Sequence, residues 1–169
     1  MKKINVKKLV LASILAAIVC VATAVFAFPL PGNGFANLGD CFVIICGGLI
    51  GPWWGFAAAA IGAALSDIIL GYAVYAPATF IIKGVMALVV YYIAVKNGKT
   101  SVVKTAVSAI IAEIIMVAGY FFFELAVYGA GVAIPDLLGN ATQAVVGAVA
   151  GTVLLSVFIK NRKIYSFFE

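Results

Sequence analysis

The sequence predicts an all-α integral membrane protein, a compact bundle of six transmembrane helices with both termini in the cytoplasm. Hydrophobic residues make up 66% of the 169-residue chain and charged residues only 10%. A soluble domain is about half apolar and about a quarter charged. Lipid must therefore solvate much of the surface. We expect one domain over residues 1–169, without a soluble domain or a linker.

Six apolar runs are candidates for the spanning helices. A spanning helix needs roughly 20 residues, with about 17 to 25 tolerated. The second run, at 38–51, has only fourteen residues. A helix of this length covers roughly 21 Å, which is too short for the bilayer. It spans the bilayer only if it starts earlier or the bilayer thins locally, and a re-entrant segment is the alternative. In chain order the runs are 8–28, 38–51, 55–71, 77–95, 102–126 and 134–159.

The basic residues predict the orientation of these helices. Ten of the eleven lie before or at the start of the first run, between the fourth and fifth runs or at the start of the fifth, or after the sixth, so six spans place all ten on one side. Loops rich in Lys and Arg remain in the cytoplasm. The net charge of +5 therefore reflects topology, and nucleic acid is not an expected partner. The ten residues are Lys2, Lys3, Lys7, Lys8, Lys96, Lys99, Lys104, Lys160, Arg162 and Lys163.

The first run has two alternative interpretations. Its basic start and the later "ATA" resemble a cleaved signal peptide, but cleavage would leave an odd number of spans, so we expect the run to remain as a helix. Ala12 and Ala16 stand four residues apart on it. Such small residues either pack against a neighbouring helix within the bundle or form a docking surface for a separate membrane subunit.

Several site chemistries are not supported. Cys20, Cys41 and Cys46 lack the CxxC spacing of zinc ligands, and the chain contains no histidine. The "NGKT" at 97–100 resembles the end of a phosphate-binding loop, but the motif needs a glycine where Ile93 stands. We therefore expect no metal, no cofactor, no catalytic residue and no ATPase within this chain.

Lys83 is the one basic residue away from the ends of an apolar run. A charge at the bilayer centre costs on the order of 2.5–3.5 kcal/mol, so such residues normally face the interior and find partners. Depth counted along the helices places Lys83 roughly 9 Å below the outer surface, with Asp40 at the lip. The alternatives are snorkelling to the outer interface and a structural pair with Asp67 or Glu124.

Other polar side chains are expected at similar depth, which favours a ligand site. Aromatic walls with a few polar groups suit a small, flat, polar organic molecule. The loop at 28–40, dense in proline, glycine and asparagine, is either a lid over this site or an ordinary connection. Helical spacing and depth place Asp67, Tyr75, Thr79, Lys83, Glu113, Tyr120, Asn140 and Gln143 in this region.

The stretch "NLGDCFVIICGGLIGPWWGFAAAAIGAALSDIILGYAVYAPATFIIKG", residues 37–84, resembles the signature of a transporter family. It is similar to the substrate-binding S components of energy-coupling factor (ECF) vitamin transporters, and most similar to the branch of hydroxymethylpyrimidine and pyridoxine uptake proteins. The six-helix layout matches over the whole chain, and the motifs match in the second to fourth helices. The resemblance implies substrate contacts from Asn37, Asp40, Asp67, Tyr75 and Lys83.

The resemblance also implies a mechanism and partners. The vitamin binds in the outer half beneath the loop, and the S component joins a membrane coupling subunit and two cytoplasmic ATPases. The family's A-x-x-x-A docking motif matches Ala12 and Ala16. The chain is thus predicted to be a non-catalytic, high-affinity vitamin-binding subunit of an ATP-driven importer in the bacterial plasma membrane.

Two other classes of function remain open. The chain could be a solitary proton-coupled carrier, with Glu113 or Asp67 carrying the proton, or a packing subunit of a larger complex. A small intramembrane enzyme would use the same two carboxyls as acid and base, but it would lack histidine and a recognisable nucleophile.

Overall fold

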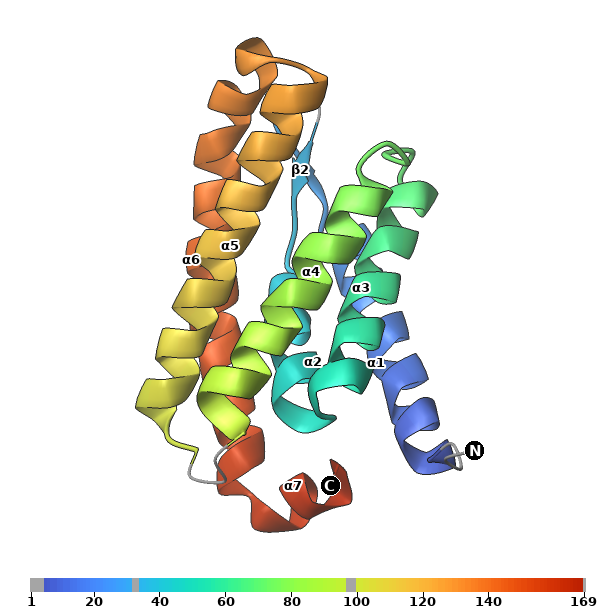
Figure 1. Ribbon diagram of the computed structural model, residues 1–169, viewed down its shortest axis with the longest axis vertical. Helices are drawn as coiled ribbons and strands as arrows, with labels where there is room; N and C mark the ends of the chain where they lie inside the picture. Colours follow the sequence, from blue (N-terminus) through green and yellow to red (C-terminus); the bar gives the residue numbers. More distant parts are fainter. Residues whose placement is uncertain (1–4, 32–33, 97–99, 169) are drawn as a thin grey trace.

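Helices dominate the computed structural model, which describes residues 5–31, 34–96 and 100–168 (Figure 1). Lys2, Lys3 and Lys99, three of the predicted orienting residues, lie outside this part of the chain. The elements are α1 (Val6–Val25), β1 (Phe28–Pro29), β2 (Phe35–Ala36), α2 (Asp40–Leu49), α3 (Pro52–Ile69), α4 (Ala76–Val90), the π-helical turn η1 (Tyr91–Val95), α5 (Val102–Val127), α6 (Ala130–Lys160) and α7 (Arg162–Phe168).

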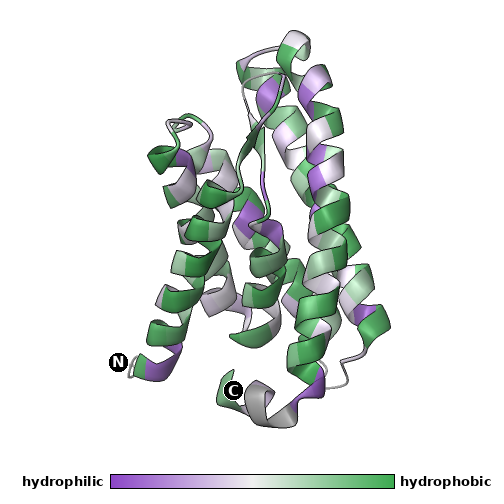
Figure 2. Ribbon diagram, turned by 180° about the vertical axis from the view of Figure 1, so that it is seen from behind, coloured by the Kyte–Doolittle hydropathy of each residue, from purple (hydrophilic) through white to green (hydrophobic). Residues whose placement is uncertain are grey.

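Among the described residues, five helices are long and apolar enough to cross a membrane. They are α1, α3, α4 with its η1 extension, α5 and α6. Most of their residues are apolar (Figure 2), and many large apolar side chains are exposed; Leu138, for example, is 77% exposed. Large apolar side chains on so much of the surface fit a multi-pass membrane protein, whose solvent is lipid.

Local sequence explains where several helices begin. The Asn5 side chain accepts a hydrogen bond from the Lys8 backbone N–H at the start of α1, and Ser101 caps α5 in the same way. Gly51 adopts a φ of 87° before Pro52 opens α3, a left-handed conformation that glycine adopts without strain. Helix α6 begins at Ala130, four residues before its predicted start.

The second predicted span differs most from the structure. Its helix, α2, has 10 residues, or about 15 Å, whereas the hydrocarbon core is about 30 Å thick. The chain first forms a short antiparallel hairpin, in which Phe28 pairs with Ala36, and then descends in extended form to α2 (Figure 1). The predicted helix over 38–51 was therefore too long, because its outer part is irregular. Such backbone at membrane depth is tolerated where protein surrounds it.

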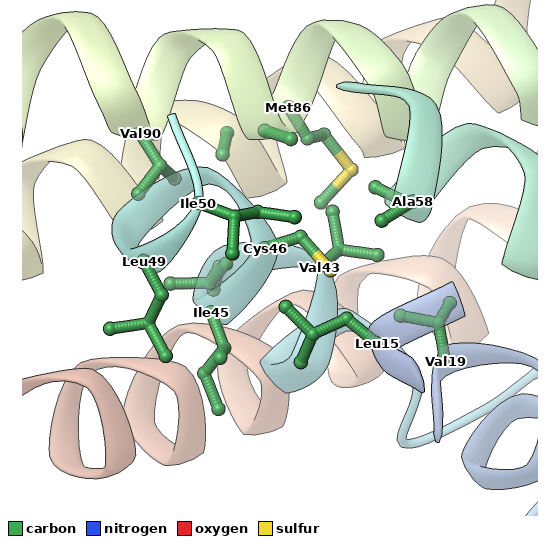
Figure 3. Packing of buried hydrophobic residues seen from close by; sticks show 14 of the residues in the cluster. Leu15, Val19, Val43, Ile45, Cys46, Leu49, Ile50, Ala58, Met86 and Val90 are labelled. Carbon is green, nitrogen blue, oxygen red and sulfur yellow. The ribbon is translucent and has the colours of Figure 1, made fainter. Parts of the chain in front are cut away.

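The apolar core surrounds α2. Val43, Ile44 and Cys46 are fully buried there, and side chains from α1, α3 and α4 pack against them (Figure 3). Small residues permit close approach: a Cβ on Gly47 would collide with the Ala87 carbonyl of α4. Packing of this kind holds membrane helices together, because water exclusion does not act between helices in lipid.

A short helix that the sequence did not predict, α7, follows α6 (Figure 1). Its Tyr165 and Phe168 pack against the apolar core, and the Lys7 Nζ of α1 lies 5.2 Å from the Phe167 ring centroid. The start of α1 and helix α7 thus meet at the same end of the bundle.

Candidate functional site

A buried ion pair lies at the start of α2. The Lys83 ammonium on α4 bonds to the Asp40 carboxylate, and these residues are 2% and 0% exposed. The expected position of Asp40 at the lip was wrong, because the descending segment carries the helix start into the bundle. Lys83 does not snorkel, and its ion-pair partner is Asp40 rather than Asp67 or Glu124.

Hydrogen bonds extend this pair to α6 and to the loop before α2. Gln143 donates from Nε2 to the second Asp40 oxygen at 2.5 Å. Its own carbonyl oxygen accepts from the Asn37 backbone N–H at 2.8 Å. The Asn37 side chain in turn accepts from the Gly39 N–H at 2.8 Å. One hydrogen-bonded network therefore joins α2, α4, α6 and the loop before α2. Among the described residues, this loop is the only non-helical backbone deep in the bundle.

A small polar cavity lies close to this network. Of the predicted site residues, Asn37, Asp67, Tyr75, Thr79, Tyr120 and Asn140 line it, whereas Asp40, Lys83, Gln143 and Glu113 do not. Helices α3, α4, α5 and α6 each contribute a lining residue. The volume of the cavity is about 20 Å³. A cavity of about 10–15 Å³ is enough to hold one water molecule. The cavity is therefore far smaller than a vitamin.

Two loop residues and one acid complete the lining, and the sequence did not predict these three as site residues. Gly34 and Phe35 come from the hairpin, and Glu124 comes from α5. Glu124, which the sequence offered only as a structural partner for Lys83, is 1% exposed and accepts a hydrogen bond from the Tyr75 hydroxyl at 3.3 Å. Its four-residue spacing from Tyr120 could have placed it in the site, because both lie on one helix face.

The hairpin is held against the cavity from two sides. The Gly34 N–H donates to Asp136 at 3.1 Å, and the ring centroid of Phe35 lies 4.9 Å from that of Tyr72. A Cβ on Gly34 would approach Asp136 and Glu124 oxygens to 3.2 and 3.3 Å. Because Gly34 has no side chain, the loop can lie close against these two acidic side chains.

Comparison with known proteins assigns the family. The model of the "ECF-type riboflavin transporter, S component" family matches residues 3–160. A protein from Pyrococcus woesei, described as an "Uncharacterized protein in gap 3'region", is 32% identical over 134 residues, covering 79% of this chain and 88% of that protein.

This chain belongs to the ECF S components. The predicted membrane, transport and S-component assignments are thereby confirmed. S components form a transporter family rather than an enzyme family, which argues against the intramembrane enzyme. The narrower prediction of a hydroxymethylpyrimidine or pyridoxine branch is not decided by this match, because the family description names riboflavin.

The docking residues expected for an S component lie between α1 and α3. Ala12 is buried at 7% exposure and Ala16 is partly buried. A Cβ on Gly62 of α3 would collide with the Ala16 carbonyl, so these small residues pack within the bundle. Both also line an apolar groove of about 540 Å³ along the outside of the two helices. Ser13 and Ala17 form an exposed part of its wall.

Glu113 of this S component lies behind the ion pair rather than in the cavity. It is 2% exposed, and neither carboxyl oxygen has a hydrogen-bond partner in the described structure. A Cβ on Gly147 would contact both Glu113 and Asp40, which shows how closely the two acids approach. Glu113 also reaches the floor of an apolar groove of about 530 Å³ between α5 and α6.

Proposed function

We propose that this chain is the high-affinity substrate-binding membrane subunit of an ATP-driven ECF vitamin importer. The observation that most directly supports this function is the small polar cavity beneath the outer hairpin, within a bundle that belongs to the S-component family. The ligand is a small heterocyclic vitamin or precursor. Pyridoxine and hydroxymethylpyrimidine are candidates from the motifs in 37–84, and riboflavin is a candidate from the family description.

The cavity residues divide into two groups in this proposal. Asn37, Asp67, Tyr75, Thr79, Tyr120 and Asn140 contact the ligand directly. The ion pair of Asp40 and Lys83, with Gln143 and the neighbouring Glu113, supports them by holding the start of α2. Removing the pair would then affect affinity through the position of α2 and the loop.

Ligand entry requires the hairpin to move. Drug-sized ligands occupy pockets of about 300–1,000 Å³, well above the present volume of the cavity. The segment with Gly34, Phe35 and Asn37 is held by a few hydrogen bonds, each worth about 0.5–3 kcal/mol net. Its withdrawal would enlarge the cavity toward the outer side at a modest cost. The hairpin acts as a lid.

The proposed topology has six passes with both termini in the cytoplasm. The extended descent and α2 together make the second pass. Lys7, Lys8, Lys96, Lys104 and Lys160 then lie at one end of the bundle, which the positive-inside rule assigns to the cytoplasm of a plasma-membrane protein.

Transport in this proposal depends on a membrane coupling subunit and two cytoplasmic ATPases. The groove between α1 and α3, with Ala12 and Ala16 at its base, is the proposed contact for the coupling subunit. Small side chains there let a partner helix approach closely. Reorientation of the S component on this module would deliver the vitamin.

Two measurements test the function. Native mass spectrometry of the purified protein should find a retained small heterocycle. Proteoliposomes with this chain alone should show no uptake of that compound, whereas adding the coupling subunit, the ATPases and ATP should restore it. Uptake by the chain alone under a proton gradient would instead establish the solitary carrier, and a protein that retains and binds no vitamin would contradict the proposal.

A further inference from the structure

The charged side chains that line the cavity are both acidic. Asp67 on α3 and Glu124 on α5 reach it, and no lysine or arginine does so among the described lining residues. The other lining groups are hydroxyls, amides and aromatic rings. The walls thus offer negative charge and hydrogen-bond acceptors.

Each of these carboxyls has an oxygen without a partner. Asp67 Oδ2 and Glu124 Oε2 are fully buried and make no hydrogen bond in the described structure, and the two residues are 3% and 1% exposed. The Tyr75 hydroxyl occupies only the other Glu124 oxygen. Burying an acceptor or a charge without compensation costs free energy, so both oxygens can accept from a donor that the described residues do not supply.

The nearest basic residue is already engaged. Lys83 gives its ammonium to Asp40 in the only salt bridge among the described residues. The other described lysines lie toward the opposite end of the bundle. A cation beside Asp67 and Glu124 would therefore come from outside the chain.

The aromatic walls favour the same kind of guest. Phe35, Tyr75 and Tyr120 surround the cavity, and the Tyr75 and Tyr120 ring centroids are 6.4 Å apart. The electron-rich face of an aromatic ring attracts a nearby cation, and the attraction grows when water is excluded. Lys83 already lies 5.3 Å from the Tyr120 centroid.

We propose that the ligand presents a positively charged nitrogen to Asp67 and Glu124. This inference rests on the proposed function and narrows the substrate class to cationic heterocycles, such as those with an aminomethyl group or a ring nitrogen that bears a fixed charge. Ligands with a free carboxylate or phosphate at that position would be repelled, since like charges in a buried site oppose binding.

Matched probes test this charge preference. Pyridoxamine and pyridoxine share one ring and differ in an ammonium against a hydroxyl group, while thiamine carries a fixed positive charge and riboflavin is neutral. Calorimetric titration of the full-length protein should show at least about tenfold tighter binding of pyridoxamine than pyridoxine, or of thiamine than riboflavin, equivalent to about 1.4 kcal/mol.

Carboxamide variants test whether Asp67 and Glu124 cause the preference for a cationic ligand. Glu124→Gln and Asp67→Asn keep the side-chain shape and remove the charge, so each should reduce the cation preference at least about threefold, about 0.65 kcal/mol, while a thermal melt shows that the protein stays folded. Thr142→Val, on the exposed side of α6, is the matched control and should leave the preference unchanged.

The other outcomes separate this inference from the proposed function. Equal or tighter binding of pyridoxine or riboflavin would overturn the charge preference but retain vitamin binding. If no probe binds, the charge of the compound retained in native mass spectrometry decides: a cation supports the inference, and a neutral or anionic compound overturns it. A protein that binds no probe and retains no compound would contradict both proposals.

Discussion

Asp40 connects three helices of this molecule. It opens α2, bonds to Lys83 of α4 and accepts from Gln143 of α6. Its place in the first turn also lets its charge interact favourably with the helix N-terminus. A single carboxylate thus fixes where the extended descent ends and the helix begins.

Replacing one member of the Asp40–Lys83 pair should destabilise the protein more than replacing both. Lys83→Met or Asp40→Asn leaves one group buried without its partner, which costs about 3–5 kcal/mol. The double variant should recover a large part of that loss in thermal unfolding in detergent. Strictly additive losses would show that the two charges do not depend on each other.

Gly147 is a second residue on which the site depends. A Cβ there would collide with Glu113 and reach 3.0 Å from the Asp40 Cβ, so Gly147→Ala should cost about 1–3 kcal/mol through overpacking. Gly131→Ala, on the same helix but with open space around it, is the control and should be neutral or slightly stabilising. Equal melting temperatures for the two variants would contradict this account.

At the scale of elements, α2 explains why the cavity lies where it does. Because α2 is short and surrounded by apolar side chains, the chain above it is free to bring loop residues into the bundle. Close packing at Gly47 keeps α2 against α4. The loop residues that line the cavity, Gly34, Phe35 and Asn37, therefore belong to the segment that leads directly into α2.

The groove between α1 and α3 yields a prediction about assembly. Ala17→Leu would partly fill the groove from its exposed wall without entering the bundle core. We expect co-purification with the coupling subunit to fall at least about tenfold, about 1.4 kcal/mol, while vitamin affinity stays unchanged.

Ile14→Leu is the matched control for this experiment, since Ile14 is exposed on α1 and does not line the groove. It should assemble normally. If Ala17→Leu assembles equally well, the groove is not the docking site, and Ala12 and Ala16 serve packing alone.

At the scale of the whole molecule, orientation is testable by cysteine labelling. In a variant without Cys20, Cys41 and Cys46, Val74→Cys lies in the exposed turn before α4. It should react with a membrane-impermeant maleimide in intact cells.

Lys96→Cys, at the opposite end after η1, should react only after permeabilisation. The reverse pattern would place the termini outside the cell. Labelling of both positions in intact cells would contradict a single orientation.

The sequence by itself determined the class of this protein and the approximate position of its long helices. Hydropathy is a property of each residue, and the orientation of a loop depends on its own basic residues. Both can therefore be evaluated from the sequence alone. The motif run in 37–84 pointed to the S-component family, and it contains four of the residues that line the cavity, Asn37, Asp67, Tyr75 and Thr79.

Only the tertiary structure decided the pairing of Asp40 with Lys83, the burial of Glu124, the length of α2 and the presence of α7. Each depends on how far a loop descends or how one helix lies against another. Counting depth along separate helices assumes that each begins at the membrane surface, and α2 begins inside. The charge of the cavity follows from that geometry, because Lys83 forms its salt bridge with Asp40, and Asp67 and Glu124 have no salt-bridge partner among the described residues.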